Sequence, residues 1–288
     1  MHRYFLHQDQ ILPHTDKTLS AGQVGLMNGW GVFSTLRAEK GVLFEYGRHW
    51  ARMTRDAKAI GVPMPCGEAE LEERLHRLVD ANEAPDATVR VVVVRNHGGM
   101  WEGSGIDRDS DLIAFTAPLK SWKDGIAVGV QPHARYAACE FAGAKVLSWA
   151  MNLRWLERAQ EKGYDEVLLL NEHDAVAECT SANVFAKFGR QVLTPPLSAG
   201  CLPGVTRQLL LDTIHVDGYH VREETLTVAD LHRADVCFIT SSTRDVRAIG
   251  AIEGEALRQD DAFIAAFQQA FGEYLALYVA QHKRAPRP

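Results

Sequence analysis

The stretch YDEVLLLNEHDAVAECTSANVFAKFGRQVLTP, residues 164–195, predicts four short strands in succession. Its apolar runs are YDEVLLL, AVAE, NVFAKF and QVLTP, and the polar NEHD and FGR are typical of the turns between strands. Elsewhere the chain mixes hairpins with helices. That order favours an α+β fold over a doubly wound parallel sheet.

Strands and helices follow on both sides of this stretch. RYFLHQDQILP (3–13) predicts a hairpin, and GVFSTLRAEKGVLFE (31–45) predicts two strands around a turn at Lys40-Gly41. The near-continuous valines of ATVRVVVVRN (87–96) predict a strand buried on both faces. Further strands are expected at 111–119, 126–135 and 234–240, and helices at 46–61, 68–83, 204–215 and 261–281.

One more helix is expected in the second half of the chain. The segment WAMNLRWLERAQEK (149–162) has helical spacing, with Ser148 as its cap and Gly163 as its end. The apolar side chains expected to face the core are those of Trp149, Leu153 and Leu156.

A chain of 288 residues is long for one simple core, so we expect two domains. The polar stretch APLKSWKDG (117–125) is the predicted boundary. We therefore expect a small N-terminal α/β domain at 1–117, a linker at 118–124 and a large C-terminal α/β domain at 125–288 that carries Lys145.

Composition excludes several classes of partner. The formal net charge is −6, and no basic stripe indicates a nucleic-acid partner. No apolar run is long enough to span a membrane, so no membrane partner is expected. The five cysteines are scattered, without a C-x-x-C pair, and no zinc-protease motif is present. We expect no metal and no disulfide framework, and a reducing, cytoplasmic setting.

Lys145 stands out within AGAKVLSWAMN (142–152), among small and apolar residues. Lysine is almost never fully buried unless something compensates for its charge. Two interpretations fit. The stem lies along an apolar surface with its ammonium in water, or the amine is kept neutral so that it attacks a carbonyl group.

Three further features have both a functional and an ordinary interpretation. In CLPGVTRQLL (201–210), a sharp turn leads into a helix whose first turn holds Val205 and Thr206, which is either an anion site or a simple loop-to-helix junction. ITSSTRD (239–245) has four hydroxyl residues that either surround a phosphate or carboxylate, or satisfy the backbone of a turn. Glu178, in a buried-looking strand, needs a partner, either a protonated ring nitrogen or an arginine.

These features together suggest one cofactor. A Schiff-base lysine, two anion sites and a carboxylate for a pyridinium nitrogen are the parts needed to hold pyridoxal 5'-phosphate.

The motifs also resemble a known family. GAKVLSWAMNLRWLERAQEKGYDEVLLLNEHDAVAECTSANVF (143–185) through VLTPPLSAGCLPGVTRQ (192–208) is similar to class IV aminotransferases, and GWGVFSTLRAEKGVLFEYGRHWARM (29–53) resembles their N-terminal signature. These are fold type IV enzymes dependent on pyridoxal phosphate. They include branched-chain and D-amino-acid aminotransferases, amine transaminases and aminodeoxychorismate lyases.

The resemblance implies a role for each matching residue. Lys145 would be the Schiff-base lysine and Glu178 the partner of the pyridine nitrogen. The phosphate would be bound by Arg52, Val205, Thr206 and Ser242. Thr243 would offer a backbone N–H to the substrate carboxylate, and Phe33 would line the substrate site or belong to the core.

Substrate choice is less defined, because the chain departs from the family there. Trp30 replaces an aspartate and Trp149 replaces a frequent tyrosine. Met100 and Trp101 stand where the lyases carry an arginine, and VRAIGAI lacks a frequent proline. Arg37, Arg95 and His97 are candidates for binding a substrate carboxylate, or the two arginines pair with surface acids.

The resemblance implies a homodimeric transaminase that moves an amino group from an amino acid or amine to a 2-keto acid. The alternative within the family is an aminodeoxychorismate lyase, favoured by the FSTLR and RNHGG stretches and disfavoured by the missing arginine. A non-catalytic relative is a third alternative, but it would have no need for both Lys145 and Glu178. The hand of the amino donor stays open.

Overall fold

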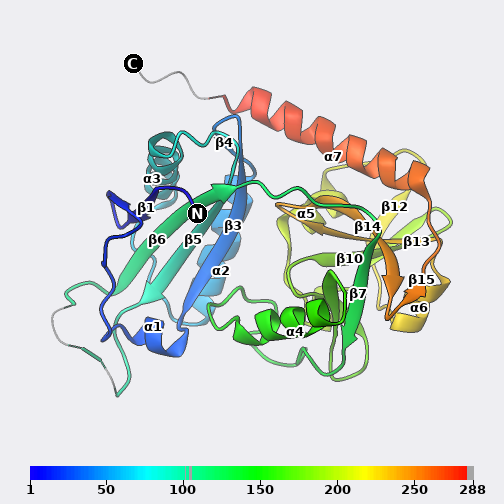
Figure 1. Cartoon of the computed structure of the whole chain (residues 1–288), viewed down its shortest axis with the longest axis horizontal. Helices are drawn as coiled ribbons and strands as arrows, with labels where there is room; N and C mark the ends of the chain where they lie inside the picture. Colours follow the sequence, from blue (N-terminus) through cyan, green and yellow to red (C-terminus); the bar gives the residue numbers. More distant parts are fainter. Residues whose placement is uncertain (101, 104–105, 284–288) are drawn as a thin grey trace. The chain divides into compact units, whose positions relative to one another are not determined.

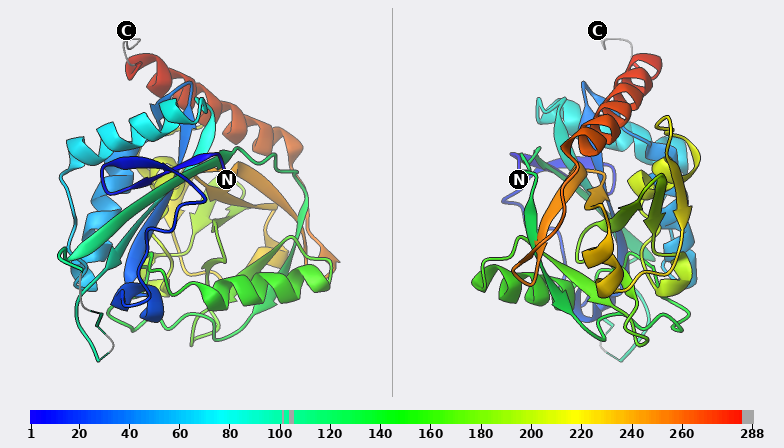
Figure 2. Two further views of the ribbon diagram at one scale, coloured as in Figure 1. Left: turned by 60° about the vertical axis from the view of Figure 1, so that its left-hand side comes forward. Right: turned by 90° about the vertical axis from the view of Figure 1, so that its right-hand side faces the viewer.

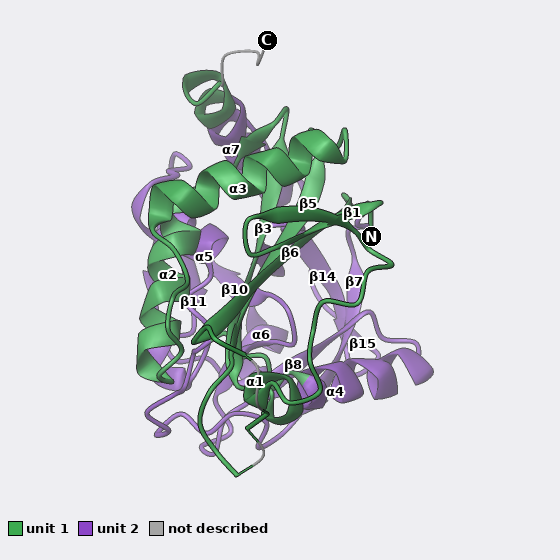
Figure 3. Cartoon of the chain, turned by 90° about the vertical axis from the view of Figure 1, so that its left-hand side faces the viewer, with its two compact units in different colours: residues 1–120, 145–149, 277–288 green, residues 121–144, 150–276 purple. Residues whose placement is uncertain are grey.

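The computed structural model describes residues 1–100, 102–103 and 106–283. The chain forms two compact units (Figure 3). Unit 1 comprises residues 1–120, 145–149 and 277–288, and unit 2 comprises residues 121–144 and 150–276. The domain organisation predicted from the sequence, with domains at 1–117 and 125–288 and a linker at 118–124, stays a prediction. The compact units differ from this prediction, because Lys145 and the end of the chain belong to unit 1.

Unit 1 is built on one antiparallel sheet with the strand order β2-β1-β6-β5-β3-β4 (Figure 1). Its strands are β1 (Tyr4–His7), β2 (Gln10–Pro13), β3 (Gly31–Glu39), β4 (Val42–Leu43), β5 (Ala87–Arg95) and β6 (Ser110–Pro118). Its helices are α1 (Val24–Asn28), α2 (Tyr46–Ala59) and α3 (Glu68–Ala81). The predicted hairpin, the turn at Lys40-Gly41 and the helices at 46–61 and 68–83 are confirmed.

Strand β5 has apolar neighbours on both faces, as its valines predicted. Val91 and Val93 pack in a core with side chains of α2 and α3, which cover that face of the sheet (Figure 2). Val92 and Val94 belong to a second cluster on the other face, together with Phe33. The alternation follows from the two-residue period of a strand.

The segment that carries Lys145 is attached to β3 in unit 1. The Lys145 carbonyl accepts a hydrogen bond of 3.0 Å from the Phe33 amide, and the Leu147 amide donates to the Gly31 carbonyl at 2.9 Å. Val146 forms an isolated antiparallel bridge with Val32. These backbone hydrogen bonds explain why residues 145–149 belong to unit 1, although residues on both sides of them belong to unit 2.

Unit 2 contains a nine-stranded mixed sheet with the order β12-β11-β10-β13-β14-β7-β8-β9, and β15 pairs with β14. Its strands are β7 (Ile126–Gln131), β8 (Glu166–Leu170), β9 (Val176–Cys179), β10 (Asn183–Phe188), β11 (Gln191–Thr194), β12 (His220–Glu223), β13 (Val236–Ser241), β14 (Asp245–Ile252) and β15 (Glu255–Ala256). Its helices are α4 (Ala150–Glu161), α5 (Val205–Asp212), α6 (Val228–Arg233) and most of α7 (Asp261–Gln281), with a 3-10 turn at Leu197–Ala199.

The four predicted strands of the 164–195 stretch are confirmed as β8 to β11. Parallel pairs (β7 with β8, β14 with β7, β11 with β12) occur beside antiparallel ones, so the fold is α+β as predicted. Strand β14 and helix α6 had no sequence prediction, and α5 ends at Asp212, three residues before the predicted end. Among the helices of the described ranges, none is both long enough and apolar enough to cross a membrane.

The predictions for helix α4 were partly wrong. The helix begins at Ala150, and the Ser148 hydroxyl donates to the carbonyls of Asn28 (3.4 Å) and Gly29 (3.2 Å). Leu153, expected in the core, is 60% exposed, and the buried side chains are those of Asn152 and Ala159. Asn152 is buried because its amide donates to the Thr180 carbonyl at 2.9 Å, a contact that helical periodicity does not encode.

Candidate active site

Lys145 is half-buried beside two aromatic rings. Its Nζ lies 4.5 Å from the centre of the Phe33 ring and 4.7 Å from the Trp149 ring, and the two rings meet edge to face at 5.4 Å. The Lys145 backbone N–H donates to the buried carboxylate of Asp56 at 3.0 Å. The amine is therefore held against an aromatic surface by a segment whose backbone is fixed on both sides.

Arg52 belongs to a buried polar group on the α2 side of unit 1. Its Nη2 donates to the Ser34 hydroxyl at 3.1 Å and lies 3.4 Å from His49 Nδ1. Ser34 Oγ and His49 Nδ1 are 2.9 Å apart. Burial, and then the charges of Arg52 and Lys145, hold the pKa of His49 well below 6.5. His49 is therefore neutral at pH 7.

Arg90 is a candidate site residue that the sequence analysis missed. Thr35 is its partner in the β3–β5 register, so Arg90 is a diagonal neighbour of Phe33 on the same face. Its guanidinium carbon lies 4.0 Å from the centre of the Phe33 ring. Its side chain makes no hydrogen bond or ion pair within the described ranges, and burial lowers the pKa of its guanidinium. The signal in the sequence was a single charge inside the valine run of β5.

The three proposed carboxylate binders all have partners within unit 1. Arg37 Nε donates to Glu39 at 2.8 Å, so this arginine pairs with an acid, which was the alternative to a role in substrate binding. Arg95 stacks on the Trp30 ring at 4.2 Å and donates to the His97 carbonyl at 2.7 Å. The His97 ring lies 2.9 Å from Glu102.

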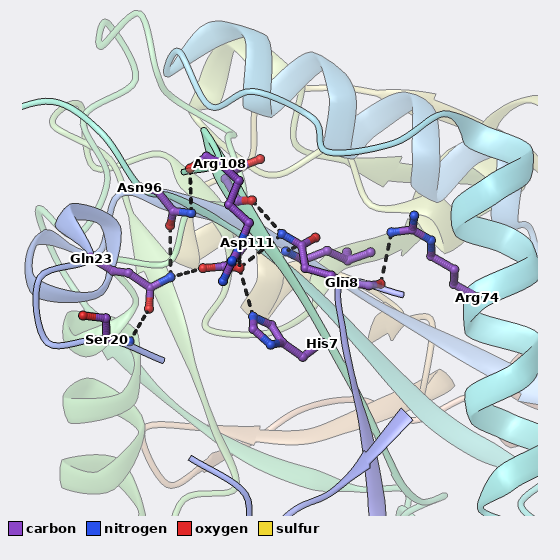
Figure 4. A network of polar contacts seen from close by, with 10 residues as sticks. His7, Gln8, Ser20, Gln23, Arg74, Asn96, Arg108 and Asp111 are labelled. Atoms are coloured by element: carbon purple, nitrogen blue, oxygen red, sulfur yellow. Dashed lines mark hydrogen bonds and ion pairs between the residues drawn. The ribbon is translucent and has the colours of Figure 1, made fainter. Parts of the chain in front are cut away.

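The base of the loop that follows β5 is fixed by a polar network around Asp111 (Figure 4). The buried Asp111 carboxylate is contacted by His7 Nε2 at 2.9 Å and by the side chains of Gln23 and Arg108. Gln23 also donates to Asn96 at 3.0 Å. The network fixes the residues next to Arg95 and His97. Met100, in the same loop, is exposed, and Trp101 lies outside the described residues.

In unit 2, Glu178 is buried at the end of β9 with one donor on each oxygen. Arg135 Nε donates to Oε1 at 3.0 Å, and the Leu202 backbone N–H donates to Oε2 at 3.0 Å. The arginine partner, which was the alternative to a ring nitrogen, is thus present. Each carboxylate oxygen has two lone pairs, so Glu178 keeps the capacity to accept a further N–H, while Arg135 balances its charge.

Val205 and Thr206, two of the predicted phosphate ligands, lie at the start of α5. Gly204 precedes the helix, and Val205 and Thr206 form its first turn, where backbone N–H groups have no intrahelical acceptor. The turn is held tightly: Asn183 donates to the Leu202 carbonyl at 2.8 Å, and a Cβ on Gly204 would collide with Asn183 Oδ1.

The Thr206 hydroxyl indicates whether this turn fits a bound anion. It is buried and has no hydrogen-bond partner in the described ranges of the chain. A buried hydroxyl without a partner costs free energy, so its place in the first turn of a helix fits a phosphate group that it would contact. The residues present therefore fit a phosphorylated cofactor.

Ser242 and Thr243 lie in the turn between β13 and β14. The turn is closed by a 3.2 Å hydrogen bond from the Arg244 amide to the Ser241 carbonyl, and both hydroxyl residues are half-buried. The structure thus brings Lys145, Phe33 and Arg52 into unit 1, and places Glu178, Val205, Thr206, Ser242 and Thr243 in unit 2.

Comparisons with known proteins define the family. The model of the family described as "Amino-transferase class IV" matches residues 31–252, and the chain belongs to this family. A D-alanine aminotransferase of Bacillus licheniformis is 27% identical over 256 residues, which cover 88% of this chain and 89% of that protein. A putative branched-chain-amino-acid aminotransferase of Methanocaldococcus jannaschii is 29% identical over 255 residues, which cover 86% and 87%.

Solved structures agree on the fold. The branched-chain amino acid aminotransferase of Escherichia coli has a TM-score of 0.86 at 23% identity, covering 96% of this chain and 95% of that one. A pyridoxal-phosphate-bound hypothetical aminotransferase of Mycobacterium tuberculosis has a TM-score of 0.83 at 23% identity, covering 95% and 99%. A putative 4-amino-4-deoxychorismate lyase of Legionella pneumophila has a TM-score of 0.81 at 20% identity, covering 90% and 96%. The fold is that of fold type IV enzymes, and the cofactor of the family is pyridoxal 5'-phosphate.

Proposed function

We propose that the protein is a transaminase that moves an amino group from an amino acid or amine to a 2-keto acid. The observation that carries the proposal is the position of Lys145, whose Nζ is held over the rings of Phe33 and Trp149 on a fixed backbone. A lysine serving only as a surface charge needs no such surroundings. Its presence in a chain of this family supports a reactive amine.

The remaining residues provide binding. Lys145 would hold the cofactor covalently, and Glu178, supported by Arg135, would accept the N–H of its ring. The proposed phosphate ligands are Arg52, Val205, Thr206 and Ser242. Pyridoxal phosphate, when bound, supplies an electron sink for the bond broken at the substrate Cα. Once the substrate amino group has displaced it from the cofactor, Lys145 Nζ would be free to take the proton from that carbon and to return it later.

Amino-acid and 2-keto-acid substrates carry a carboxylate, and Arg90 and the Thr243 backbone N–H are its proposed ligands. Arg90 is half-buried without an acidic partner in the described ranges, and a guanidinium in that state favours binding an anion. Phe33 lies beside both Arg90 and Lys145, so its ring would set the spacing between the substrate carboxylate and the reacting amine. Arg37, Arg95 and His97 stay proposed as additional carboxylate ligands.

The second candidate is an aminodeoxychorismate lyase, which would use the same lysine to eliminate pyruvate and release 4-aminobenzoate. The FSTLR and RNHGG stretches, which are similar to those of the lyases, favour it. A transaminase needs two substrates in turn, whereas the lyase needs one, so the two functions are separated by their substrate requirement.

We also propose a homodimer in a reducing cytoplasm. The exposed Met151 and Leu153 side chains on α4 are apolar groups that a second copy would cover.

The proposed reducing setting has separate support. All five cysteines are free thiols, which is compatible with it.

The test is the visible absorption spectrum of the purified protein before and after addition of single L- and D-amino acids. Conversion of the bound cofactor to its amine form by one donor, and its return with a 2-keto acid, would support transamination and identify the donor's hand. A cofactor spectrum that no donor changes, with pyruvate release from aminodeoxychorismate, would support the lyase. Failure to bind pyridoxal phosphate would exclude both.

A further inference from the structure

We propose that Glu166 and Arg244 form a positioning pair that holds the Ser242–Thr243 turn in the shape that binds the cofactor phosphate. The proposal rests on the proposed function, because it concerns the same site. Neither residue belongs to the sequence-predicted set, and neither is proposed to touch the cofactor.

Glu166 is the centre of a fully satisfied network in unit 2. Its side chain is inaccessible to solvent. Oε1 accepts from the Val167 amide at 3.0 Å, the Thr180 amide at 3.2 Å and the Thr180 hydroxyl. Oε2 accepts from Ser181 Oγ at 2.8 Å and Arg244 Nη1 at 2.7 Å. A buried carboxylate with this many donors has one favoured geometry, so it fixes the groups that surround it.

Arg244 attaches the β13–β14 turn to this network. Besides its bond to Glu166, its Nη2 donates to Ser181 Oγ at 2.8 Å, and its guanidinium stacks on the Trp122 ring at 4.1 Å. Its backbone amide closes the turn on Ser241, and its carbonyl accepts from Arg247 Nε at 3.0 Å. Both the side chain and the backbone of Arg244 are therefore held, directly after Ser242 and Thr243.

The network also reaches the segment that carries Glu178. Thr180 and Ser181 follow Glu178 by two and three residues, and Glu178 itself is opposite Leu169 in the β8–β9 pair. The Glu166 carboxylate thus contacts one segment next to the ring-binding acid and another next to the phosphate-binding turn. This arrangement fixes the separation between the two segments within unit 2.

Stability alone does not account for this pair. A buried ion pair is often no more stabilising than apolar side chains of similar volume, because both charges lose their hydration. What the pair supplies is a defined geometry. A guanidinium that makes two hydrogen bonds and a stacking contact restricts the turn more than an apolar side chain would.

The experiment compares binding of pyridoxal 5'-phosphate and of pyridoxal, which lacks the phosphate, by absorbance titration of the cofactor-free protein. The variant is Arg244→Met, with Arg244→Lys as the conservative change. Lys187→Met is the matched control, because Lys187 forms ion pairs with Asp235 and Asp260 at the opposite end of the β10–β13 pair.

We expect Arg244→Met to weaken binding of pyridoxal 5'-phosphate by about tenfold, because the displaced turn would lose roughly one hydrogen bond to the phosphate. Binding of pyridoxal should be unchanged. Arg244→Lys should retain part of the preference for the phosphate, and Lys187→Met all of it. Should Arg244→Met not fold, Ser181→Ala is the alternative variant. It removes two hydrogen bonds of the same network but leaves the bond between Arg244 and Glu166, so it is expected to lower the same preference by a smaller factor.

An equal loss of affinity for both compounds, or none for either, would overturn the positioning role while leaving the proposed function intact. If the unmodified protein binds neither compound, the proposed function fails, and the positioning role fails with it.

Discussion

Lys145 Nζ and the guanidinium of Arg90 lie over the same aromatic ring, that of Phe33, at 4.5 Å and 4.0 Å from its centre. Lys145 comes from a segment joined to β3, and Arg90 comes from the neighbouring strand β5. The proposed function makes Lys145 the reactive amine and Arg90 the carboxylate ligand. A substrate with an amino group near a carboxylate requires those two groups at a defined separation.

Replacing Lys145 by alanine is expected to abolish transamination, because no other amine in the proposed site could hold the cofactor and move the substrate proton. The measurement is turnover together with the absorption spectrum after incubation with pyridoxal phosphate. Lys162→Ala, at an exposed lysine beyond the end of α4, is the control and should keep full activity. Residual turnover of Lys145→Ala near the unmodified rate would disprove the assignment.

Arg90→Met is expected to raise KM for amino and keto acids by at least about tenfold, because a charge-assisted hydrogen bond to the carboxylate is lost. Amine donors without a carboxylate should lose much less. Steady-state kinetics with one amino acid and one matched amine measures the difference. Arg37→Met, which removes a partner of Glu39, should have the smaller effect on KM, and an equal effect would favour Arg37 as a carboxylate ligand.

Thr206→Val should change stability and cofactor binding in opposite directions. The Thr206 hydroxyl is buried without a partner in the described ranges, so its replacement by a methyl group should raise the free energy of unfolding of the cofactor-free protein by about 1 kcal/mol. Affinity for pyridoxal phosphate should fall, because the phosphate loses a donor. Urea denaturation and cofactor titration measure the two quantities. Weaker binding with lower stability would indicate a structural role instead.

His49 is expected to make the protein less stable in mild acid. Because its pKa is well below 6.5 in the folded state, the unfolded chain takes up a proton that the folded chain does not. The free energy of unfolding is therefore at its full value above pH 6.5 and falls below it, by up to about 1.4 kcal/mol per pH unit from this residue.

The comparison for His49 is urea denaturation of the unmodified protein and of His49→Gln at pH 7.5 and pH 5.5. The glutamine variant is expected to be less stable at pH 7.5, because the contacts with Ser34 and Arg52 change, but to lose less stability on acidification. If both proteins respond equally to pH, His49 does not carry the acid sensitivity.

Local patterns in the sequence were enough for most elements. The four strands of 164–195, the valine-rich β5 and helices α2 and α3 all follow from periodicity and turn residues that act over a few positions. The motifs around Lys145, Glu178 and Thr206 could also be recognised in the sequence, because each is a short stretch of neighbouring residues.

Contacts between residues far apart in the chain could not be predicted from these local patterns. Leu153 was expected in the core and is exposed, whereas Asn152 is buried and its side-chain amide donates to the backbone carbonyl of Thr180. Arg90 was missed because its proposed role depends on the β3–β5 register, which places it diagonal to Phe33. Nothing in a local window specifies such a register.

By itself, the sequence determined the class of fold, the order of most elements and the resemblance to the family, since these depend on side-chain type and on spacing within one segment. It also predicted the chemical parts of the site. The tertiary structure decided which residues meet: Lys145 with Phe33, Arg52 with Ser34, and Glu166 with Arg244. The physical reason is that such contacts join residues far apart in the chain. They form only when sheet pairing and burial bring separate segments together.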